Sequence, residues 1–309
     1  MVKKSEILTY QTGDFTIQFP LLYIEGGQPG PVVTITAGVH GCEYPGILSA
    51  IQLYKKLEPA KIQGTIKIIP IVNLPAFETR TMFVCPIDGK NPNRCFPGRL
   101  DGTYTEVLVY HLFNKFIKNS DYHIDLHCGD MVENLLPIAL MHQTGNENID
   151  KSSKELAECF EVPIVITSTN LGFQDGGTSY AMASESGVPS IIAEVGGIGQ
   201  VTVNDIEKIM KSLNNVLKYV ACIEGVLEID KKFPHFSHFV WVGAKKKGIF
   251  YRNCELGQEV SQGEIIGTIE DYLGNELEII HAPISGKITI ITTSPAVKEK
   301  GLLMALSGN

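Results

Sequence analysis

The chain has 309 residues, 44% of them hydrophobic, and a mean hydropathy near zero, which is typical of a globular protein with a large core. Its formal charge of −8 and pI near 5.5 argue against a nucleic-acid surface, and the short cluster Lys245–Lys247 is interpreted as a solvated loop. The opening segment Met1–Leu8 lacks the apolar stretch of a signal peptide, and no segment has the apolar length needed to cross a bilayer. We therefore expect a cytoplasmic protein with no nucleic-acid or membrane partner.

Strand-like and helix-like patterns alternate along the first part of the chain. The strand-like runs are mostly continuous in Val and Ile, as expected for strands covered on both faces. This order predicts an α/β domain over residues 1–225, with helices on both sides of a parallel or mixed sheet. The predicted strands are Val32–Ala37, Thr65–Val72, Tyr122–Leu126, Pro163–Ser168 and Pro189–Glu194, and the predicted helices are Pro45–Leu57, Thr105–Ile117, Ser152–Phe160, Ser179–Ser186 and Asn204–Ile223.

The pattern of hydrophobic residues and glycines changes after residue 225. Short strands separated by glycine turns fill Gly248–Ser307, and their alternation predicts a small antiparallel β domain over residues 226–309. This region resembles the barrel-sandwich fold of biotinyl and lipoyl carriers. Those carriers present a modified lysine at a hairpin tip, whereas the tip expected here, Gly274–Glu278, contains none. We therefore expect a structural or gating role over the active-site mouth rather than a carrier function.

A histidine and a glutamate three residues apart, His40 and Glu43, follow the first predicted strand, and His127 ends a later one. Side chains at the carboxyl ends of neighbouring strands meet at one edge of a sheet. Two imidazoles and one carboxylate form the three-ligand set of a catalytic zinc, which leaves one position open for water. Simple hydrogen bonding at the strand ends is the alternative for an isolated motif of this kind.

The segment Asn73–Thr103 breaks the alternation. It is rich in Pro, Gly, Asn and Asp and is longer than a loop that only connects two elements usually is, which indicates a binding loop. Within it, Asn93 and Arg94 can hold a substrate carboxylate through a neutral donor and a bidentate guanidinium. Alternatively, Asn93 caps a turn and Arg94 pairs with a local acid.

Glu194 ends an otherwise apolar predicted strand. A buried carboxylate must meet a cation, hydrogen-bond donors or a metal-bound water, or else stay protonated. A structural ion pair would satisfy it, but its location beside the other motifs favours a general base.

Four motifs occur in this order between about residues 30 and 200: His40-Gly41-Cys42-Glu43, the segment Asp88–Gly98, Asp125-Leu126-His127-Cys128-Gly129 and Glu194-Val195-Gly196-Gly197. In order and spacing they resemble the succinylglutamate desuccinylase and aspartoacylase family, which belongs to the zinc carboxypeptidase-like hydrolases.

The resemblance implies a zinc-dependent hydrolase, with one Zn²⁺ per chain, that removes an acyl group from a small N-acylated amino acid or related amine. It implies a zinc-carboxypeptidase-like fold, with His40, Glu43 and His127 as zinc ligands, Asn93 and Arg94 as binders of the substrate carboxylate, and Glu194 acting on water. Family members often carry an arginine two residues after the position of Arg80, where this chain has Met82. Arg80 is therefore named as the substitute that stabilises the oxyanion.

Three alternatives stay open. A thiol, Cys42 or Cys128, beside a histidine could serve as the nucleophile of a cysteine hydrolase. A zinc carboxypeptidase acting on small peptides would need the same zinc and carboxylate clamp. The methionine at position 82 also leaves room for a non-catalytic protein that binds zinc and a carboxylate. The chain is also a possible homo-oligomer, and its seven scattered cysteines, which include no C-x-x-C pair, favour a reduced compartment.

Overall fold

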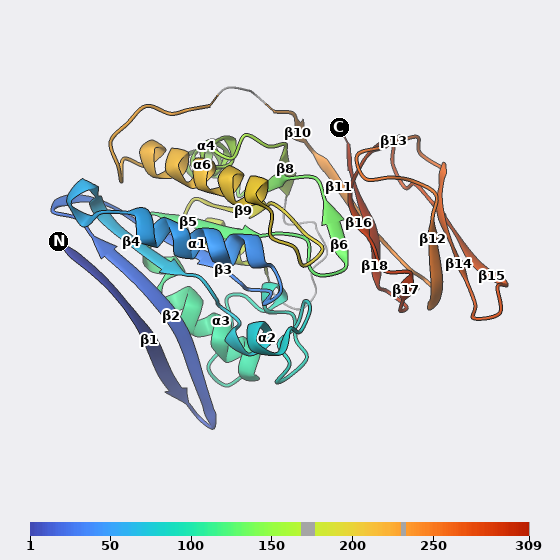
Figure 1. The fold of residues 1–309 in the computed structure, drawn as a ribbon, viewed down its shortest axis with the longest axis horizontal. Helices are drawn as coiled ribbons and strands as arrows, with labels where there is room; N and C mark the ends of the chain where they lie inside the picture. Colours follow the sequence, from blue (N-terminus) through green and yellow to red (C-terminus); the bar gives the residue numbers. More distant parts are fainter. Residues whose placement is uncertain (168–176, 230–232, 309) are drawn as a thin grey trace.

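A large mixed sheet forms the body of the molecule (Figure 1). The computed structural model describes residues 1–167, 177–229 and 233–308. Within those ranges nine strands pair in the order β1-β2-β4-β3-β5-β9-β7-β8-β10. These strands are β1 (Val2–Thr12), β2 (Phe15–Glu25), β3 (Gln28–Ala37), β4 (Gln63–Ile69), β5 (Tyr122–His127), β7 (Ile138–His142), β8 (Ile164–Thr167), β9 (Ser190–Glu194) and β10 (His235–Phe236).

The centre of this sheet is parallel. Strand β3 pairs in parallel with β4 and β5, and β5 pairs in parallel with β9, whereas β7 runs antiparallel to β9. The carboxyl ends of β3, β5 and β9 therefore lie side by side. Their inner residues are almost entirely buried, which agrees with the apolar, β-branched runs in the sequence.

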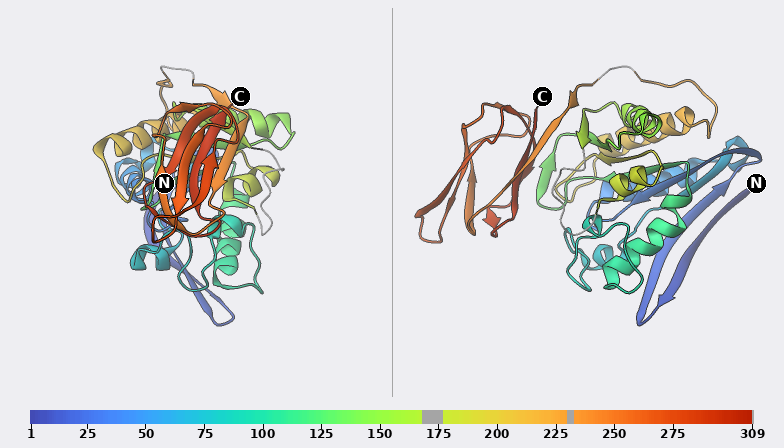
Figure 2. Two further views of the ribbon diagram at one scale, coloured as in Figure 1. Left: turned by 90° about the vertical axis from the view of Figure 1, so that its right-hand side faces the viewer. Right: turned by 180° about the vertical axis from the view of Figure 1, so that it is seen from behind.

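Helices cover both faces of the sheet (Figures 1 and 2). Helices α1 and α6 share one core cluster with the central strands, and α3 and α5 contribute to a second cluster. The predicted α/β arrangement with a mixed sheet is therefore confirmed. The helices are α1 (Tyr44–Lys56), α2 (Leu74–Thr79), α3 (Tyr104–Lys115), α4 (Glu147–Glu158), α5 (Ser179–Glu185) and α6 (Val203–Tyr219), with short 3₁₀ turns at Pro59–Lys61, Pro92–Arg94 and Ile117–Asn119.

Differences from the predicted elements have local causes. Helix α4 begins five residues earlier than expected because the side chain of Asn146 caps it, accepting hydrogen bonds from the backbone of Asn148 and Ile149. Helix α6 ends before the predicted Ile223, and Ala221 adopts a left-handed conformation with φ of 57°. The hairpin of β1 and β2, the strand β7 and the short helix α2 were not predicted. Ser168, the last residue of one predicted strand, lies outside the described residues.

The C-terminal region is all β, as predicted, and its two sheets enclose a separate core cluster (Figure 2). Each region contributes one strand to a sheet of the other. Strand β6 (Glu133–Leu135) pairs with the C-terminal strand β16, and β10, which follows residue 225, pairs with β8 of the large sheet. The division at residues 225 and 226 stays a prediction. One sheet contains β11 (His238–Gly243), β18 (Leu302–Gly308), β16 (Gly286–Thr292) and β13 (Glu259–Val260), and the other contains β15 (Glu276–His281), β14 (Ile265–Glu270), β12 (Gly248–Arg252) and β17 (Ala296–Val297).

Among the described residues, we find no helix with both the length and the apolar character required to cross a membrane.

Helix α1 packs closely against β5 at Gly46. A Cβ atom at this position would lie 2.9 Å from Cβ of Leu126 and 3.1 Å from its carbonyl oxygen. Leu126 directly precedes His127, and Gly46 lies three residues after Glu43. The absence of a side chain at Gly46 therefore lets the helix that follows Glu43 approach the strand that ends at His127.

We predict that Gly46→Ala lowers the free energy of unfolding. Overpacking against the backbone and Cβ of Leu126 costs about 1–3 kcal/mol, and the middle of this range is larger than the roughly 1 kcal/mol by which alanine favours a helix over glycine. Urea unfolding of this variant and of Leu48→Ala, on the exposed side of the same helix, measures the difference. The close contact would be contradicted if Gly46→Ala were at least as stable as the unsubstituted protein.

Candidate active site

Two candidate ligands follow the carboxyl end of β3. The chain leaves the strand at Gly38, whose φ of +65° favours glycine, and His40 lies in the turn that follows. Glu43 is the N-cap residue of α1, and Pro45 occupies the first turn, where its missing N–H costs nothing. The turn and the helix start thus direct both side chains toward the end of β5, where His127 lies.

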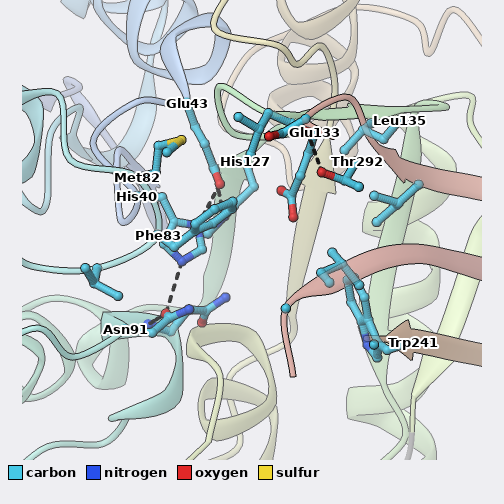
Figure 3. Close-up of a pocket in the computed structure, with 18 of the residues that line it drawn as sticks. His40, Glu43, Met82, Phe83, Asn91, His127, Glu133, Leu135, Trp241 and Thr292 are labelled. Atoms are coloured by element: carbon cyan, nitrogen blue, oxygen red, sulfur yellow. Dashed lines mark hydrogen bonds and ion pairs between the residues drawn. The ribbon is translucent and has the colours of Figure 1, made fainter. Parts of the chain in front are cut away.

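His40, Glu43 and His127 converge (Figure 3). The Nδ1 atom of His40 lies 2.6 Å from Oε1 of Glu43, and the Nδ1 atom of His127 lies 2.9 Å from Oε2 of the same carboxylate. One ligand atom from each residue falls within 4.8 Å of the others, an arrangement that can hold a metal ion.

The far nitrogens of both histidines also have partners. Nε2 of His40 lies 3.1 Å from Oδ1 of Asn91, an oxygen that already accepts a hydrogen bond from the backbone N–H of Asn93. Nε2 of His127 lies 3.1 Å from Oδ2 of Asp125. In the structure the Nδ1 atoms contact the acceptor oxygens of Glu43, and the Nε2 atoms contact the acceptors Asn91 and Asp125. With a proton kept on each Nε2 by these outer partners, a metal ion that displaces the Nδ1 contacts would be bound through the Nδ1 lone pairs.

A buried polar network holds Asp125 in place. Its carboxylate accepts hydrogen bonds from the hydroxyls of Thr36, at 2.6 Å, and Ser179. Thr36 also lies 2.9 Å from the ring of His123, whose burial lowers its pKa to about 4 and so keeps it neutral. Three elements, β3, β5 and α5, therefore orient the ring of His127.

The charges in the site depend on one another. Burial alone would raise the pKa of Glu43, but His127 and His40 lower it to about 2. Burial alone would lower the pKa of His127, but Glu43 and Asp125 raise it well above its ordinary value. Protons and a metal ion compete for the same Nδ1 lone pairs, so these positions favour cations of either kind.

The two predicted carboxylate-binding residues lie in the 3₁₀ turn Pro92–Arg94 and line the same cavity as the metal cluster. Oδ1 of Asn93 accepts the backbone N–H of Ser179 at 2.9 Å, so this side chain also caps α5. Arg94 donates to the carbonyl of Asn93 at 2.6 Å. Burial lowers the pKa of Arg94, while Tyr180 and Glu194 act in the opposite direction.

Glu194 ends β9 beside β5, in register with His127. It lines the cavity, and burial raises the pKa of its carboxyl well above the ordinary range. His127 opposes this rise, whereas the neighbouring acids Glu43, Glu133 and Asp125 add to it. Within the described ranges, the carboxylate of Glu194 forms no hydrogen bond or ion pair.

Arg80 lies at the C-cap of α2 in a left-handed conformation with φ of 53°. Its exposed side chain lines the cavity, as does Met82 two residues later. Arg80 is therefore placed at the outer part of the cavity wall, and its role in the reaction stays a proposal.

The cavity has a volume of about 1410 Å³ and is lined by both regions of the chain. Its wall includes Trp241, Lys298 and Lys300 from the C-terminal sheets. A predicted position of the C-terminal β region beside the active-site mouth is therefore observed. These lining residues come from strands or turns that lie far in the sequence from His40, Glu43 and His127. A gating role for them stays a prediction.

Sequence reasoning assigned no role to three residues that the structure places around the metal cluster: Asn91, Asp125 and Glu133. Asp125 carried a usable signal, because residues two apart on a strand share one face and Asp125 lies two before His127. Asn91 lies within the motif Asp88–Gly98, but only the tertiary fold shows that it meets His40. Glu133 carried no local signal.

The two thiols beside the ligands are poorly suited to nucleophilic attack. Burial raises the pKa of Cys128 well above its ordinary value, and the surrounding carboxylates raise it further. Burial also raises the pKa of Cys42, which does not line the cavity. A nucleophilic cysteine requires a lowered pKa, so the structure disfavours a cysteine hydrolase.

Comparison with known proteins finds a matching family profile and a similar curated protein. The sequence profile of the succinylglutamate desuccinylase/aspartoacylase catalytic domain matches residues 29–220. N-alpha-acetyl-L-2,4-diaminobutyric acid deacetylase of Halomonas elongata is 29% identical over 262 residues, covering 82% of this chain and 75% of that protein.

Solved structures show the same fold. The product-bound ectoine utilization protein EutE of Ruegeria pomeroyi has a TM-score of 0.87 at 22% identity, covering 100% of this chain and 95% of the other. A succinylglutamate desuccinylase/aspartoacylase of Rhodobacter sphaeroides has a TM-score of 0.85 at 24% identity, covering 99% of this chain and 95% of the other.

We predict that the purified protein binds one divalent metal ion per chain and that His127→Ala abolishes this binding, because two remaining donors cannot form a high-affinity site. Elemental analysis after metal loading measures the stoichiometry, and His281→Ala, an exposed histidine of the C-terminal region, is the control. Full occupancy in His40→Ala, Glu43→Ala and His127→Ala would remove these residues from the ligand set.

Proposed function

Since the chain belongs to the succinylglutamate desuccinylase/aspartoacylase family, we propose that it is a zinc-dependent hydrolase that cleaves the amide bond of a small N-acylated amino acid. The observation that carries this proposal is the convergence of His40, Glu43 and His127 in a cavity that also contains Glu194 and Arg94. These side chains provide metal ligands, a proton acceptor and a binder of carboxylate in one place.

The donor set fits zinc. Two imidazole nitrogens and one carboxylate are the protein ligands of a catalytic zinc site, and the contacts of Asn91 and Asp125 with the far nitrogens supply the expected outer shell. When bound, zinc lowers the pKa of water toward neutrality and polarises a carbonyl group.

Arg94 and Asn93 are proposed to hold the carboxylate of the substrate. The guanidinium provides a planar pair of donors, and its burial strengthens an ion pair with a carboxylate. The hydrogen bonds of Asn93 to α5 and of Arg94 to Asn93 fix the clamp before the substrate arrives. The scissile amide is thereby positioned over the metal cluster.

Glu194 is proposed to accept the proton of the attacking water on its carboxylate and then to donate it to the nitrogen of the departing amine. A carboxyl group whose pKa lies above its ordinary range suits both halves of this transfer. Arg80, the nearest match to the arginine that family members often carry, is proposed to stabilise the oxyanion from the cavity wall.

The named relatives suggest where to search for the substrate. The Halomonas elongata protein is a deacetylase of N-alpha-acetyl-L-2,4-diaminobutyric acid, which makes N-acetyl amino acids the first compounds to test on this chain. A carboxypeptidase reaction uses the same metal ligands and carboxylate clamp, so C-terminal dipeptides are the matching competitors.

We predict that the zinc-loaded protein releases amine from at least one small N-acyl amino acid and acts much less on C-terminal dipeptides. A ninhydrin screen of both compound classes measures this. In Glu194→Gln, zinc content is expected to be retained while kcat falls about 10²- to 10⁴-fold, the usual cost of losing a general base.

Glu185→Gln is the control for that variant, because Glu185 pairs with His142 at the end of α5 away from the metal cluster. A normal kcat in Glu194→Gln would show that Glu194 does not transfer the proton and that its role is structural. Tight binding of N-acyl amino acids without turnover by the zinc-loaded protein would favour a non-catalytic binding protein.

We also predict that Arg94→Lys raises KM for a carboxylate substrate about 10-fold or more with little loss of stability, since lysine lacks the planar fork. The control is Arg99→Lys, at the exposed ion pair of Arg99 with Glu106. Steady-state kinetics and thermal melting separate the roles. A sharply lower Tm with unchanged KM would show that Arg94 is structural.

A further inference from the structure

Glu133 brings a further carboxylate into the cavity. It is the first residue of β6, which is held in place by pairing with β16 of the C-terminal sheet. Figure 3 shows the carboxylate directed into the space between His127 and Trp241. Glu133 therefore lies on the side of the metal cluster that faces the C-terminal region.

Within the described part of the chain, this carboxylate has few partners. Its Oε2 accepts one long hydrogen bond, 3.3 Å, from the backbone N–H of Asp130, and it forms no ion pair there. Asp130 differs, because its two oxygens accept the backbone N–H groups of Met131, at 2.6 Å, and Phe83, at 2.8 Å. Asp130 thus serves the local loop, whereas Glu133 keeps acceptor capacity toward the cavity.

Glu133 lies among other acidic groups. Its pKa is raised to about 7, chiefly by burial, with the carboxylates of Glu43 and Asp130 adding to the rise and the Asp130 backbone N–H and His40 opposing it. A carboxylate that faces a cavity with a single long hydrogen bond can accept an ion pair from a cationic group placed there.

We propose that Glu133 forms a subsite for an ammonium group on the amine half of the substrate. The inference rests on the proposed function, in which Arg94 and Asn93 hold the carboxylate of the same molecule. The cavity then offers a cation for the carboxylate, an anion for the ammonium and the metal cluster for the amide. The substrate class is an N-acylated diamino acid whose second amine is free.

This role is distinct from that of Glu194. Glu194 ends β9 in register with the ligand His127, whereas Glu133 projects from a strand that belongs to the C-terminal sheet. A carboxylate that binds a substituent of the substrate changes selectivity, and one that transfers the proton changes turnover of every substrate.

The test compares two substrates that differ only in charge at the end of the side chain. Nα-acetyl-2,4-diaminobutyrate carries an ammonium where N-acetylnorvaline carries a methyl group of similar size. We expect the zinc-loaded protein to prefer the former, and Glu133→Gln to lower kcat/KM for it about 10- to 100-fold, as for loss of a buried charged hydrogen bond. The value for N-acetylnorvaline should change less than about threefold, and Glu185→Gln should change neither.

Calorimetric binding of free 2,4-diaminobutyrate and free norvaline provides a readout without turnover. The first ligand should bind more tightly than the second, and Glu133→Gln should remove the difference. The proposal is overturned if the unsubstituted protein does not discriminate between the paired compounds. It is also overturned if Glu133→Gln preserves the preference, or if it lowers turnover of both substrates equally.

Failure of the proposed hydrolase activity and failure of the ammonium subsite give different results. If no N-acyl amino acid is hydrolysed at all, the proposed function fails, and the calorimetric comparison still decides whether Glu133 binds an ammonium group. If N-acetylnorvaline is hydrolysed as well as its charged counterpart, the hydrolase stands and the ammonium subsite is rejected.

Discussion

The hydrogen bonds of Glu43 to two histidines are the constraint on which the rest of the site depends. One carboxylate joins His40 in the turn after β3 to His127 at the end of β5, residues that lie far apart in the chain. The parallel pairing of β3 with β5 fixes this meeting, and the start of α1 holds Glu43 between the rings. Asn91 contacts the far nitrogen of His40, and Asp125 contacts the far nitrogen of His127. Both contacts hold the two rings in their positions around Glu43.

The sequence was informative where local pattern and tertiary position coincide. Central strands of the sheet are continuous apolar runs because both faces are covered, so their positions and the residues at their ends were predictable. The metal cluster followed from this, since His40, Glu43 and His127 all lie at such strand ends. The C-terminal strands were predictable for a similar reason, because glycine turns separate short alternating segments.

Other parts depended on contacts between distant segments. Strand β6 is three residues long and exists through its pairing with β16, so no local pattern marks it or gives Glu133 a place in the cavity. Asn91 meets His40 only because the loop after α2 folds back over the turn after β3. The second role of Asn93, as the acceptor for the first N–H of α5, likewise required the folded chain.

The crossing of β6 into the C-terminal sheet has a consequence for how such a hydrolase can diversify. The candidate metal ligands and Glu194 lie on or beside strands of the large mixed sheet, whereas Glu133 and Trp241 lie on strands of a C-terminal sheet. A hydrophobic cluster that includes Ile138 and Phe239 joins the two regions. Under the proposed function, substitutions in the C-terminal core can shift the cavity wall at Trp241 and so alter which amines are accepted, without replacing a residue that acts on the amide bond.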